Sequence, residues 1–234
     1  MDAASWEPQG QALLDYINGE HDNELIIHSY EGQVNVPVEI YFRSWENFPE
    51  LEQYALSLCQ GKVLDIGAGS GCHSLALKEM GLEVHSIDIS PLMVEVMKKQ
   101  GLENVYCGDI DHFKAEPFDT IVMFMNGIGF VKSPEGLGIF LQKIKQLLKP
   151  DGQLIFDTTD ISVEDPERAK NSKGKYFGIV EYNLEYKGQK GEKFDWLFVD
   201  SILLHKIAKR NGWHSQVVYD DLDGQYLARL RRIE

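Results

Sequence analysis

The sequence has few cysteines and lacks any long apolar run. Its three cysteines, Cys59, Cys72 and Cys107, are odd in number and widely spaced, so they predict neither a disulfide framework nor a zinc site. We therefore expect three reduced thiols in a cytoplasmic protein. No stretch approaches the roughly 18 apolar residues of a membrane span. The first residues show neither the basic start nor the apolar core of a signal peptide.

Basic residues are also scarce. Lysine and arginine total 23 against 37 aspartates and glutamates, which gives a net charge of −14 over 234 residues. Phosphate groups of nucleic acids and anionic lipids attract clustered lysine and arginine. The one basic cluster, Arg229–Arg232, is interrupted by Leu230 and is more typical of a polar strand edge. The charge therefore predicts no nucleic-acid partner and no membrane binding.

The centre of the chain alternates between short β-rich runs and helical patterns. We expect strands at 63–66, 84–87, 105–107, 120–125 and 154–156, and helices at 71–80, 91–100 and 134–148. Ser90-Pro91 and Ser133-Pro134 each place a capping residue before a proline at the first helical position. A turn is expected at 149–152. Strand–helix alternation predicts βαβ units with right-handed crossovers and a parallel sheet.

Two segments depart from this alternation. Residues 1–60 are predicted to form an N-terminal cap or lid, with a helix near 9–18, an edge strand over 34–42 that contains Pro37, and a helix near 48–58. Residues 158–200 are predicted as an insertion that ends in an aromatic hairpin. Its strands are expected at about 176–187 and 192–200, joined by the four residues 188–191.

The main domain is predicted over 61–234 around that insertion, and it ends with a helix at 201–211 and strands at 213–219 and 225–232. We expect the two unusual segments to pack together as a lid.

A glycine-rich turn follows the first central strand, in the sequence Asp65-Ile66-Gly67-Ala68-Gly69-Ser70-Gly71. Glycines permit positive φ angles and let a ligand approach the backbone. The dinucleotide fingerprint would require glycine at position 72, where the chain has Cys72. Asp65, beside the glycines, favours a ligand with an ammonium group. Asp88, at the end of the next strand, can accept hydrogen bonds from both ribose hydroxyls. The pattern predicts a nucleoside that carries an amino acid.

Asp65–Gly71 resembles the first motif of class I S-adenosylmethionine-dependent methyltransferases. Further matches follow in the family's order, at Asp88, Gly108–Ile110, Phe118–Asn126 and Leu147–Leu154. The resemblance covers about residues 45–157 and, more loosely, 201–234. It implies a doubly wound α/β fold with a mostly parallel seven-stranded sheet whose last strand is antiparallel. It also implies S-adenosylmethionine as cofactor. The acidic charge and the lid-like segments at 1–60 and 158–200 predict a small-molecule methyl acceptor, and we expect a monomer or homodimer.

The resemblance assigns roles to individual residues. Gly67, Ala68 and Gly69 would lie against the methionine part of the cofactor, and Asp65 would reach its ammonium group directly or through water. Asp88 would bind the ribose hydroxyls. The remaining assignments are Ile89 and Ile110 beside the adenine ring, Asp109 at the adenine amino group, Met125 and Asn126 facing the sulfonium and the acceptor, and Arg43 at the cofactor carboxylate. The sequence shows no carboxylate and asparagine cluster of the metal-dependent catechol type, which predicts no metal ion. The chemistry requires no dedicated general base.

Each assignment has a structural alternative. Asp65 and Asp88 are also suited to capping the helices that follow them, and Asp109 to stabilising a turn. Arg43 on the polar face of a strand would ordinarily be solvated. His73, early in the helix after the glycine turn, can border the cofactor or only pack. The alternative functions are a nicotinamide-dependent oxidoreductase, and a protein that binds S-adenosylmethionine without catalysis.

Overall fold

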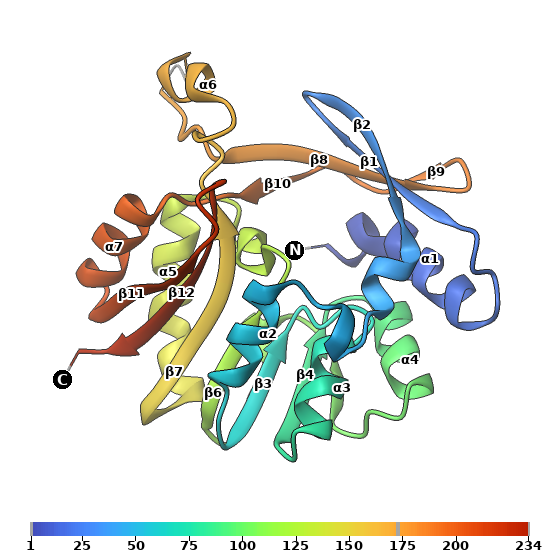
Figure 1. Cartoon of the computed structure of the whole chain (residues 1–234), viewed down its shortest axis with the longest axis horizontal. Coiled ribbons are helices and arrows are strands. Elements are labelled where there is room, and N and C mark those ends of the chain that lie inside the picture. The colour runs from blue at the N-terminus through green and yellow to red at the C-terminus, as the bar shows by residue number, and fades with distance from the viewer. Residues whose placement is uncertain (1, 172–173, 234) are drawn as a thin grey trace. The chain divides into compact units, whose positions relative to one another are not determined.

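The computed structural model describes residues 2–171 and 174–233, and Figure 1 shows its helices and strands in chain order. The chain divides into two compact units. The first comprises Met1–Phe48, Leu64–Phe113 and Glu181–Phe194, and the second comprises Pro49–Val63, Lys114–Val180 and Asp195–Glu234. Within the described ranges, no helix is both long and apolar enough to cross a membrane.

A seven-stranded sheet runs in the order β11-β12-β7-β6-β3-β4-β5, with helices on both sides. Its strands are β3 (Lys62–Ile66), β4 (Glu83–Asp88), β5 (Val105–Cys107), β6 (Phe118–Met123), β7 (Leu148–Thr159), β11 (Trp213–Asp220) and β12 (Gln225–Arg232). β4 and β5 are parallel, as are β6 and β7. β12 is antiparallel to both β7 and β11. This topology confirms the predicted mostly parallel α/β sheet with an antiparallel last strand.

Within its described residues, the first unit contains three α-helices and four short 3-10 helices. The α-helices are α1 (Glu7–Ile17), α3 (Cys72–Glu79) and α4 (Pro91–Lys99); the 3-10 helices are η1 (Ala3–Trp6), η2 (Val38–Phe42), η3 (Trp45–Asn47) and η4 (Ile110–His112). Ser90 caps α4 as predicted, because its hydroxyl accepts a hydrogen bond from the Met93 N–H at 3.4 Å. The predicted helices at 9–18, 71–80 and 91–100 are confirmed within two residues at each end.

The second unit contains the remaining α-helices. They are α2 (Glu50–Ser57), α5 (Pro134–Ile144), α6 (Pro166–Asn171) and α7 (Ser201–Arg210), with the 3-10 turns η5 (Gly127–Val131) and η6 (Lys145–Leu147). Trp213 fills the core beside α5, where its indole N–H donates to the Leu141 carbonyl at 3.0 Å. It is 1% exposed.

The predicted turn at 149–152 is instead part of β7. Phe118 of β6 pairs with Leu148, whereas Thr120 pairs with Gln153, so the intervening residues of β7 form an irregularity in the ladder. Pro150 and Gly152 suggested a turn, in which both residue types are common. Both are also common at irregularities of a β-strand, which is where the structure places them. The predicted helix at 134–148 ends at Ile144 and continues only as a single 3-10 turn.

A second sheet joins strands from the N-terminal segment and from the insertion. Its strands are β1 (Glu24–Ser29), β2 (Gly32–Pro37), β8 (Ile179–Tyr186), β9 (Gln189–Lys190) and β10 (Phe194–Leu197), in the order β10-β8-β1-β2 with β9 also on β8. Within the first unit, Ile27 of β1 lies opposite Leu184 of β8. The two unusual segments are therefore paired, while their action as a lid and the domain boundary at residue 60 stay predictions.

Three details of that sheet differ from the sequence predictions. β1 was not predicted. The strand expected over 34–42 ends at Pro37. The next residue, Val38, donates its N–H to the Asn23 carbonyl at 3.1 Å and is the first residue of η2. The hairpin connection is two residues long instead of four, because Tyr186 pairs with Gln189 across Lys187 and Gly188. Their φ angles of 48° and 78° are those of a tight hairpin turn.

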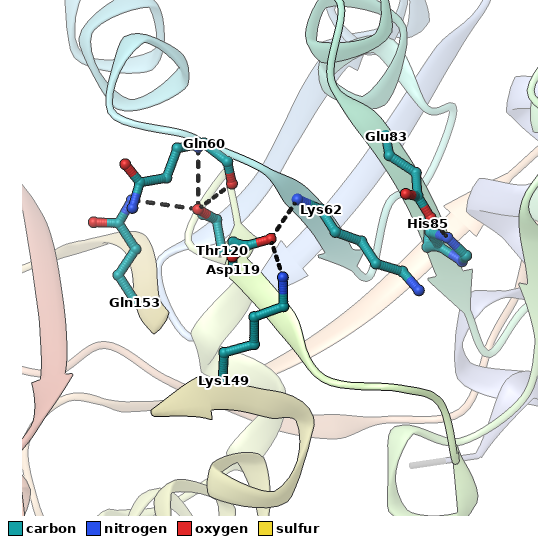
Figure 2. A network of polar contacts seen from close by, with 8 residues as sticks. All are labelled: Gln60, Lys62, Glu83, His85, Asp119, Thr120, Lys149 and Gln153. Atoms are coloured by element: carbon teal, nitrogen blue, oxygen red, sulfur yellow. Dashed lines mark hydrogen bonds and ion pairs between the residues drawn. The ribbon is translucent and has the colours of Figure 1, made fainter. Parts of the chain in front are cut away.

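A polar network in the second unit joins the amino-terminal ends of its strands (Figure 2). Asp119 accepts hydrogen bonds from the Lys62 backbone N–H and the Lys149 ammonium group, each at 2.8 Å. The Thr120 hydroxyl exchanges hydrogen bonds with the backbone of Gln60 at 3.0 and 3.2 Å. Ligands of open α/β sheets bind beyond the opposite, carboxyl ends of the strands, so this network belongs to the framework of the fold.

Candidate functional site

The glycine turn lies in the first unit, between the carboxyl end of β3 and the start of α3. Gly67 and Gly69 have φ angles of +71° and +59°. A Cβ atom at either position would meet no atom within 4 Å, whereas one at Gly71 would lie 2.6 Å from the Leu102 Cδ1 atom. The first two glycines therefore border open space that a ligand can use, and Gly71 allows close packing.

Hydrogen bonds to β4 hold this turn in place. The N–H groups of Gly67 and Ala68 both donate to the Ile87 carbonyl, at 2.8 and 3.3 Å. The Ala68 side chain belongs to an apolar cluster with Val94 and Met97. The Ala68 side chain therefore packs in the core, and its contact with the cofactor stays a prediction.

Asp88 is the last residue of β4, and two backbone N–H groups orient its carboxylate. One carboxylate oxygen accepts from Gly69 at 3.0 Å and the other from Ser90 at 2.8 Å. Capping of α4 is the role of Ser90, so Asp88 does not serve as that cap. Asp88 is 6% exposed, and burial raises the pKa of its carboxyl group to about 6 although both hydrogen bonds favour the charged form.

Asp65 is buried beneath the glycine turn. It accepts a hydrogen bond from the Ser74 hydroxyl at 2.6 Å, and Ser74 also pairs with the Ser86 hydroxyl at 2.8 Å. Burial raises the pKa of Asp65, while the charge of nearby His73 and the Ser74 hydrogen bond lower it. The residue at the N-cap of α3 is Gly71, so Asp65 is not a helix cap. The Ser74 partner was not predicted, because a serine inside a helix carries no distinctive signal.

Arg43 is held in a stack of side chains beside the start of α3. Its Nε donates to the Ile40 carbonyl at 2.8 Å, and its guanidinium lies 5.5 Å from the centre of the Phe48 ring. Phe48 stacks in turn on His73, with ring centres 4.8 Å apart and planes 17° apart. Arg43 is therefore not the fully solvated side chain that the alternative prediction expected. His73 packs against Phe48, which agrees with the packing role predicted as its alternative.

The segment after β5 approaches the end of β4. The Gly108 N–H donates to the Asp88 carbonyl at 2.9 Å, which brings the next two residues close to the Asp88 turn. Asp109 accepts from the Asp111 N–H at 2.8 Å and caps η4, so its structural role as a turn residue is present. Ile110 is buried, and Ile89 is half-buried. The first unit therefore brings together the glycine turn, both buried acids and the loop at 108–110.

Met125 and Asn126 lie in the second unit, just beyond the carboxyl end of β6. Both adopt left-handed backbone conformations, with φ angles of 55° and 58°. The Asn126 N–H donates to Asp157 at 2.8 Å, and its side-chain oxygen accepts from the Thr159 hydroxyl at 2.9 Å. Its carbonyl accepts from the Trp196 indole N–H at 3.1 Å. Asn126 is thus fixed from three directions.

Sequence reasoning missed these partners of Asn126. Asp157 is fully buried and ends the apolar run of β7. A carboxylate in a run that predicts a buried strand is the signal that could have identified it, because such a group needs hydrogen-bond donors. Trp196 gave no comparable signal beyond its place in an aromatic hairpin.

The residues of the first unit fit a polar adenosyl ligand. Open space lies beside Gly67 and Gly69, and the Asp88 carboxylate is pre-oriented by backbone N–H groups at the border of that space. Carboxylates suit hydroxyl and ammonium donors, whereas a pyrophosphate would be repelled. Within residues 2–171 and 174–233, no group of three or more His, Cys, Asp or Glu side chains is placed to hold a metal ion.

Known proteins are similar to this chain in sequence. Residues 64–156 match a family model described as a methyltransferase domain. A protein from Staphylococcus carnosus, named as an uncharacterized methyltransferase, is 32% identical over 157 residues, which cover 66% of this chain and 73% of that protein. A ubiquinone biosynthesis O-methyltransferase from Actinobacillus pleuropneumoniae is 36% identical over 120 residues, and the match spans 46% of this chain and half of that protein.

A solved structure is similar over nearly the whole chain. It is the crystal structure of an S-adenosylmethionine-dependent methyltransferase from Bacteroides fragilis in complex with S-adenosyl-L-homocysteine. It matches with a TM-score of 0.87 and 37% identity, over 99% of this chain and 97% of that one. The chain therefore belongs to the S-adenosylmethionine-dependent methyltransferases, and S-adenosylmethionine is its cofactor.

Proposed function

We propose that this methyltransferase transfers the methyl group directly, in line and without a metal ion, to a small-molecule acceptor. The observation that carries the proposal is the cradle in the first unit, where open space beside Gly67 and Gly69 is bordered by the oriented Asp88 carboxylate. The net charge of −14 supports a small molecule over a nucleic acid, because it would repel phosphates.

Each residue near the cradle has a proposed contact. Asp88 would accept hydrogen bonds from the ribose hydroxyls, and the backbone of Gly67–Gly69 would lie against the methionine part. Asp65, held by Ser74, would attract the ammonium group. Arg43 would pair with the cofactor carboxylate. The remaining proposed contacts are Ile89 and Ile110 to the adenine ring and Asp109 to its amino group.

The cofactor supplies an activated methyl group on a sulfonium, which leaves as a neutral thioether. The protein must then orient the acceptor and exclude water, and orientation alone can supply about 7–11 kcal/mol of the barrier. A general base is required only where the acceptor must lose a proton. Asn126 is the proposed orienting group for the acceptor, because three hydrogen bonds fix it. The family resemblance supports this proposal, since it implies that Asn126 and Met125 face the sulfonium.

An Asn126→Ala variant is expected to lose about tenfold in kcat/KM, the effect of one lost hydrogen bond to the acceptor. Its dissociation constant for S-adenosylhomocysteine should stay within twofold of the wild type. Thr159→Val is the graded control, because it removes only the hydroxyl that holds the Asn126 side chain and should cause a smaller loss. Steady-state kinetics with unchanged turnover for Asn126→Ala would remove this residue from the proposal.

Cofactor binding is expected to weaken at acidic pH. Asp88 must be ionised to accept from both ribose hydroxyls, and its pKa is about 6. Protonation of Asp88 therefore raises the dissociation constant of S-adenosylhomocysteine as the pH falls below about 6. The rise approaches tenfold for each further pH unit. Calorimetry across this range measures the effect. An Asp88→Asn variant should bind S-adenosylhomocysteine weakly, and its dissociation constant should depend less on pH. If that constant depended on pH as steeply as in the wild type, the titrating group would be assigned to Asp65.

The same titration has the opposite sign for stability. Because the pKa of Asp88 is raised from 3.8, the folded protein holds the proton more tightly than the unfolded chain between about pH 4 and pH 6. The contribution of Asp88 to the free energy of unfolding therefore decreases as the pH rises through this window. Acid should strengthen this part of the fold while it weakens cofactor binding.

The acceptor can be tested with a panel of small molecules incubated with enzyme and S-adenosylmethionine. Mass spectrometry would detect S-adenosylhomocysteine and the methylated product together. Hydroxyl compounds come first in the panel, because several relatives are named ubiquinone biosynthesis O-methyltransferases. Methylation of protein or nucleic acid alone would overturn the small-molecule proposal. Binding of S-adenosylhomocysteine without any turnover would favour the non-catalytic alternative, and the nicotinamide alternative requires that NADH binds.

A further inference from the structure

Helix α1 touches the turn that orients Asp88, and it does so at a glycine. Gly10 is buried within α1. A Cβ atom there would lie 2.9 Å from the Leu92 Cβ atom and 2.9 Å from the Ser90 hydroxyl oxygen. Neither atom can rotate far, because one is fixed to the backbone of α4 and the other caps that helix. The absence of a side chain at Gly10 is what lets α1 lie against this turn.

Ser90 links this contact to Asp88. The Ser90 N–H donates to one carboxylate oxygen of Asp88 at 2.8 Å, while Gly69 donates to the other at 3.0 Å. A shift of the Ser90 backbone would therefore change the direction in which the carboxylate points. α1 lies along α4 (Figure 1), and their C-terminal ends are joined by a 3.2 Å hydrogen bond from Lys99 to Asn18.

The other side of α1 is anchored to the second sheet. Asp15 accepts from the Tyr186 hydroxyl at 3.0 Å and pairs with the Lys187 ammonium group at 2.7 Å. Asn23, just before β1, donates to the Ala12 carbonyl at 3.4 Å. These contacts anchor α1 to the second sheet, which keeps α1 in contact with the Ser90 turn.

We propose that Gly10 is a positioning residue for the cofactor site: through it, α1 holds the Ser90 turn and thereby fixes the carboxylate of Asp88. The inference rests on the proposed function in one respect, the assignment of Asp88 to the ribose hydroxyls. Helix stability gives no reason for glycine at this position, since alanine is the better helix former. The close approach to Ser90 and Leu92 is the physical reason that remains.

The test compares two helical glycines. Gly10→Ala is expected to raise the dissociation constants of S-adenosylhomocysteine and of 5′-methylthioadenosine, which lacks the amino acid, by about tenfold each. The control is Gly138→Ala in α5, where the nearest atom to a new Cβ is the flexible Asn211 amide nitrogen at 3.3 Å. This control should change neither constant by more than twofold. An unchanged affinity in Gly10→Ala, measured by calorimetry, would overturn the inference.

A double variant separates positioning from general loss of structure. If Gly10 acts through Asp88, then Gly10→Ala/Asp88→Ala should bind no more weakly than Asp88→Ala alone, because coupled residues are not additive. Losses that multiply in the double variant would overturn the inference. Where Gly10→Ala folds poorly by circular dichroism, Asp15→Asn replaces it, since this change loosens α1 from behind. It should raise both constants about threefold, and unchanged constants would again overturn the inference.

The outcomes also separate this inference from the proposed function. Wild-type affinity in Asp88→Ala would remove the ribose assignment and the inference with it. A strong effect in Asp88→Ala together with no effect in Gly10→Ala would leave the proposed function intact and remove only the role of Gly10.

Discussion

An Asp88→Ala variant is expected to bind S-adenosylhomocysteine about 100-fold more weakly than the wild type. The carboxylate would accept the two ribose hydroxyls, and hydrogen bonds to charged groups contribute about 1.5–3 kcal/mol each. Two bonds at the lower end of that range give about 3 kcal/mol, which corresponds to about 100-fold in affinity. Calorimetry with S-adenosylhomocysteine measures the loss directly and does not require the acceptor.

The matched control for this variant is Glu95→Ala on α4. Glu95 is exposed, and one of its carboxylate oxygens lies 3.9 Å from the Lys99 ammonium nitrogen. Surface ion pairs of this kind contribute little to stability. The Glu95→Ala variant should bind S-adenosylhomocysteine as tightly as the wild type. Removing Asp88 also removes a buried charge but leaves the Gly69 and Ser90 N–H groups without their acceptor, so thermal unfolding must accompany the binding measurement. A loss of less than about fivefold in a folded Asp88→Ala protein would contradict the ribose assignment.

A Gly69→Ala variant is expected to lose between about tenfold and 100-fold in cofactor affinity. The added methyl group projects into open space, which is the space proposed for the methionine part. Overlap of this kind costs about 1–3 kcal/mol. The positive φ angle of +59° at this position adds a strain of about 1–2 kcal/mol to the folded state. The variant should therefore lose both stability and binding.

Gly81→Ala separates those two losses. Gly81 also has a positive φ angle, +86°, and a Cβ atom there would meet nothing within 4 Å. It follows α3 at the far end from the glycine turn. Denaturant unfolding should show a similar decrease in stability for both variants, whereas only Gly69→Ala should bind S-adenosylhomocysteine weakly. Equal affinity in the two variants would show that the cofactor does not use the space beside Gly69.

Local sequence patterns predicted those parts of the candidate site whose residues lie close together in the chain. Asp65, Gly67 and Gly69 lie within five residues, and the strand before them predicts where their turn begins. Asp88 was predictable because it ends the next strand of a parallel sheet, where neighbouring carboxyl ends meet. The roles of both acids as helix caps were excluded only by the structure, in which Gly71 stands at the N-cap of α3 and Ser90 caps α4.

Contacts between distant parts of the chain were not predictable in this way. Arg43, Phe48 and His73 form one stack although 30 residues separate the first from the last. The two-residue hairpin turn was missed because Lys187 adopts a positive φ angle that its side chain does not signal. The contact of Gly10 with Ser90 joins two helices 80 residues apart. No periodicity or spacing in the sequence relates such positions.

The discontinuous first unit has a consequence for how the protein is made. Its three chain stretches are Met1–Phe48, Leu64–Phe113 and Glu181–Phe194, and the last of them supplies the β8 residues that pair with β1 and anchor α1. During synthesis, the ribosome delivers the glycine turn and Asp88 long before it delivers those residues. The nascent chain therefore carries an incompletely supported form of the proposed cofactor site until Glu181–Phe194 has been made.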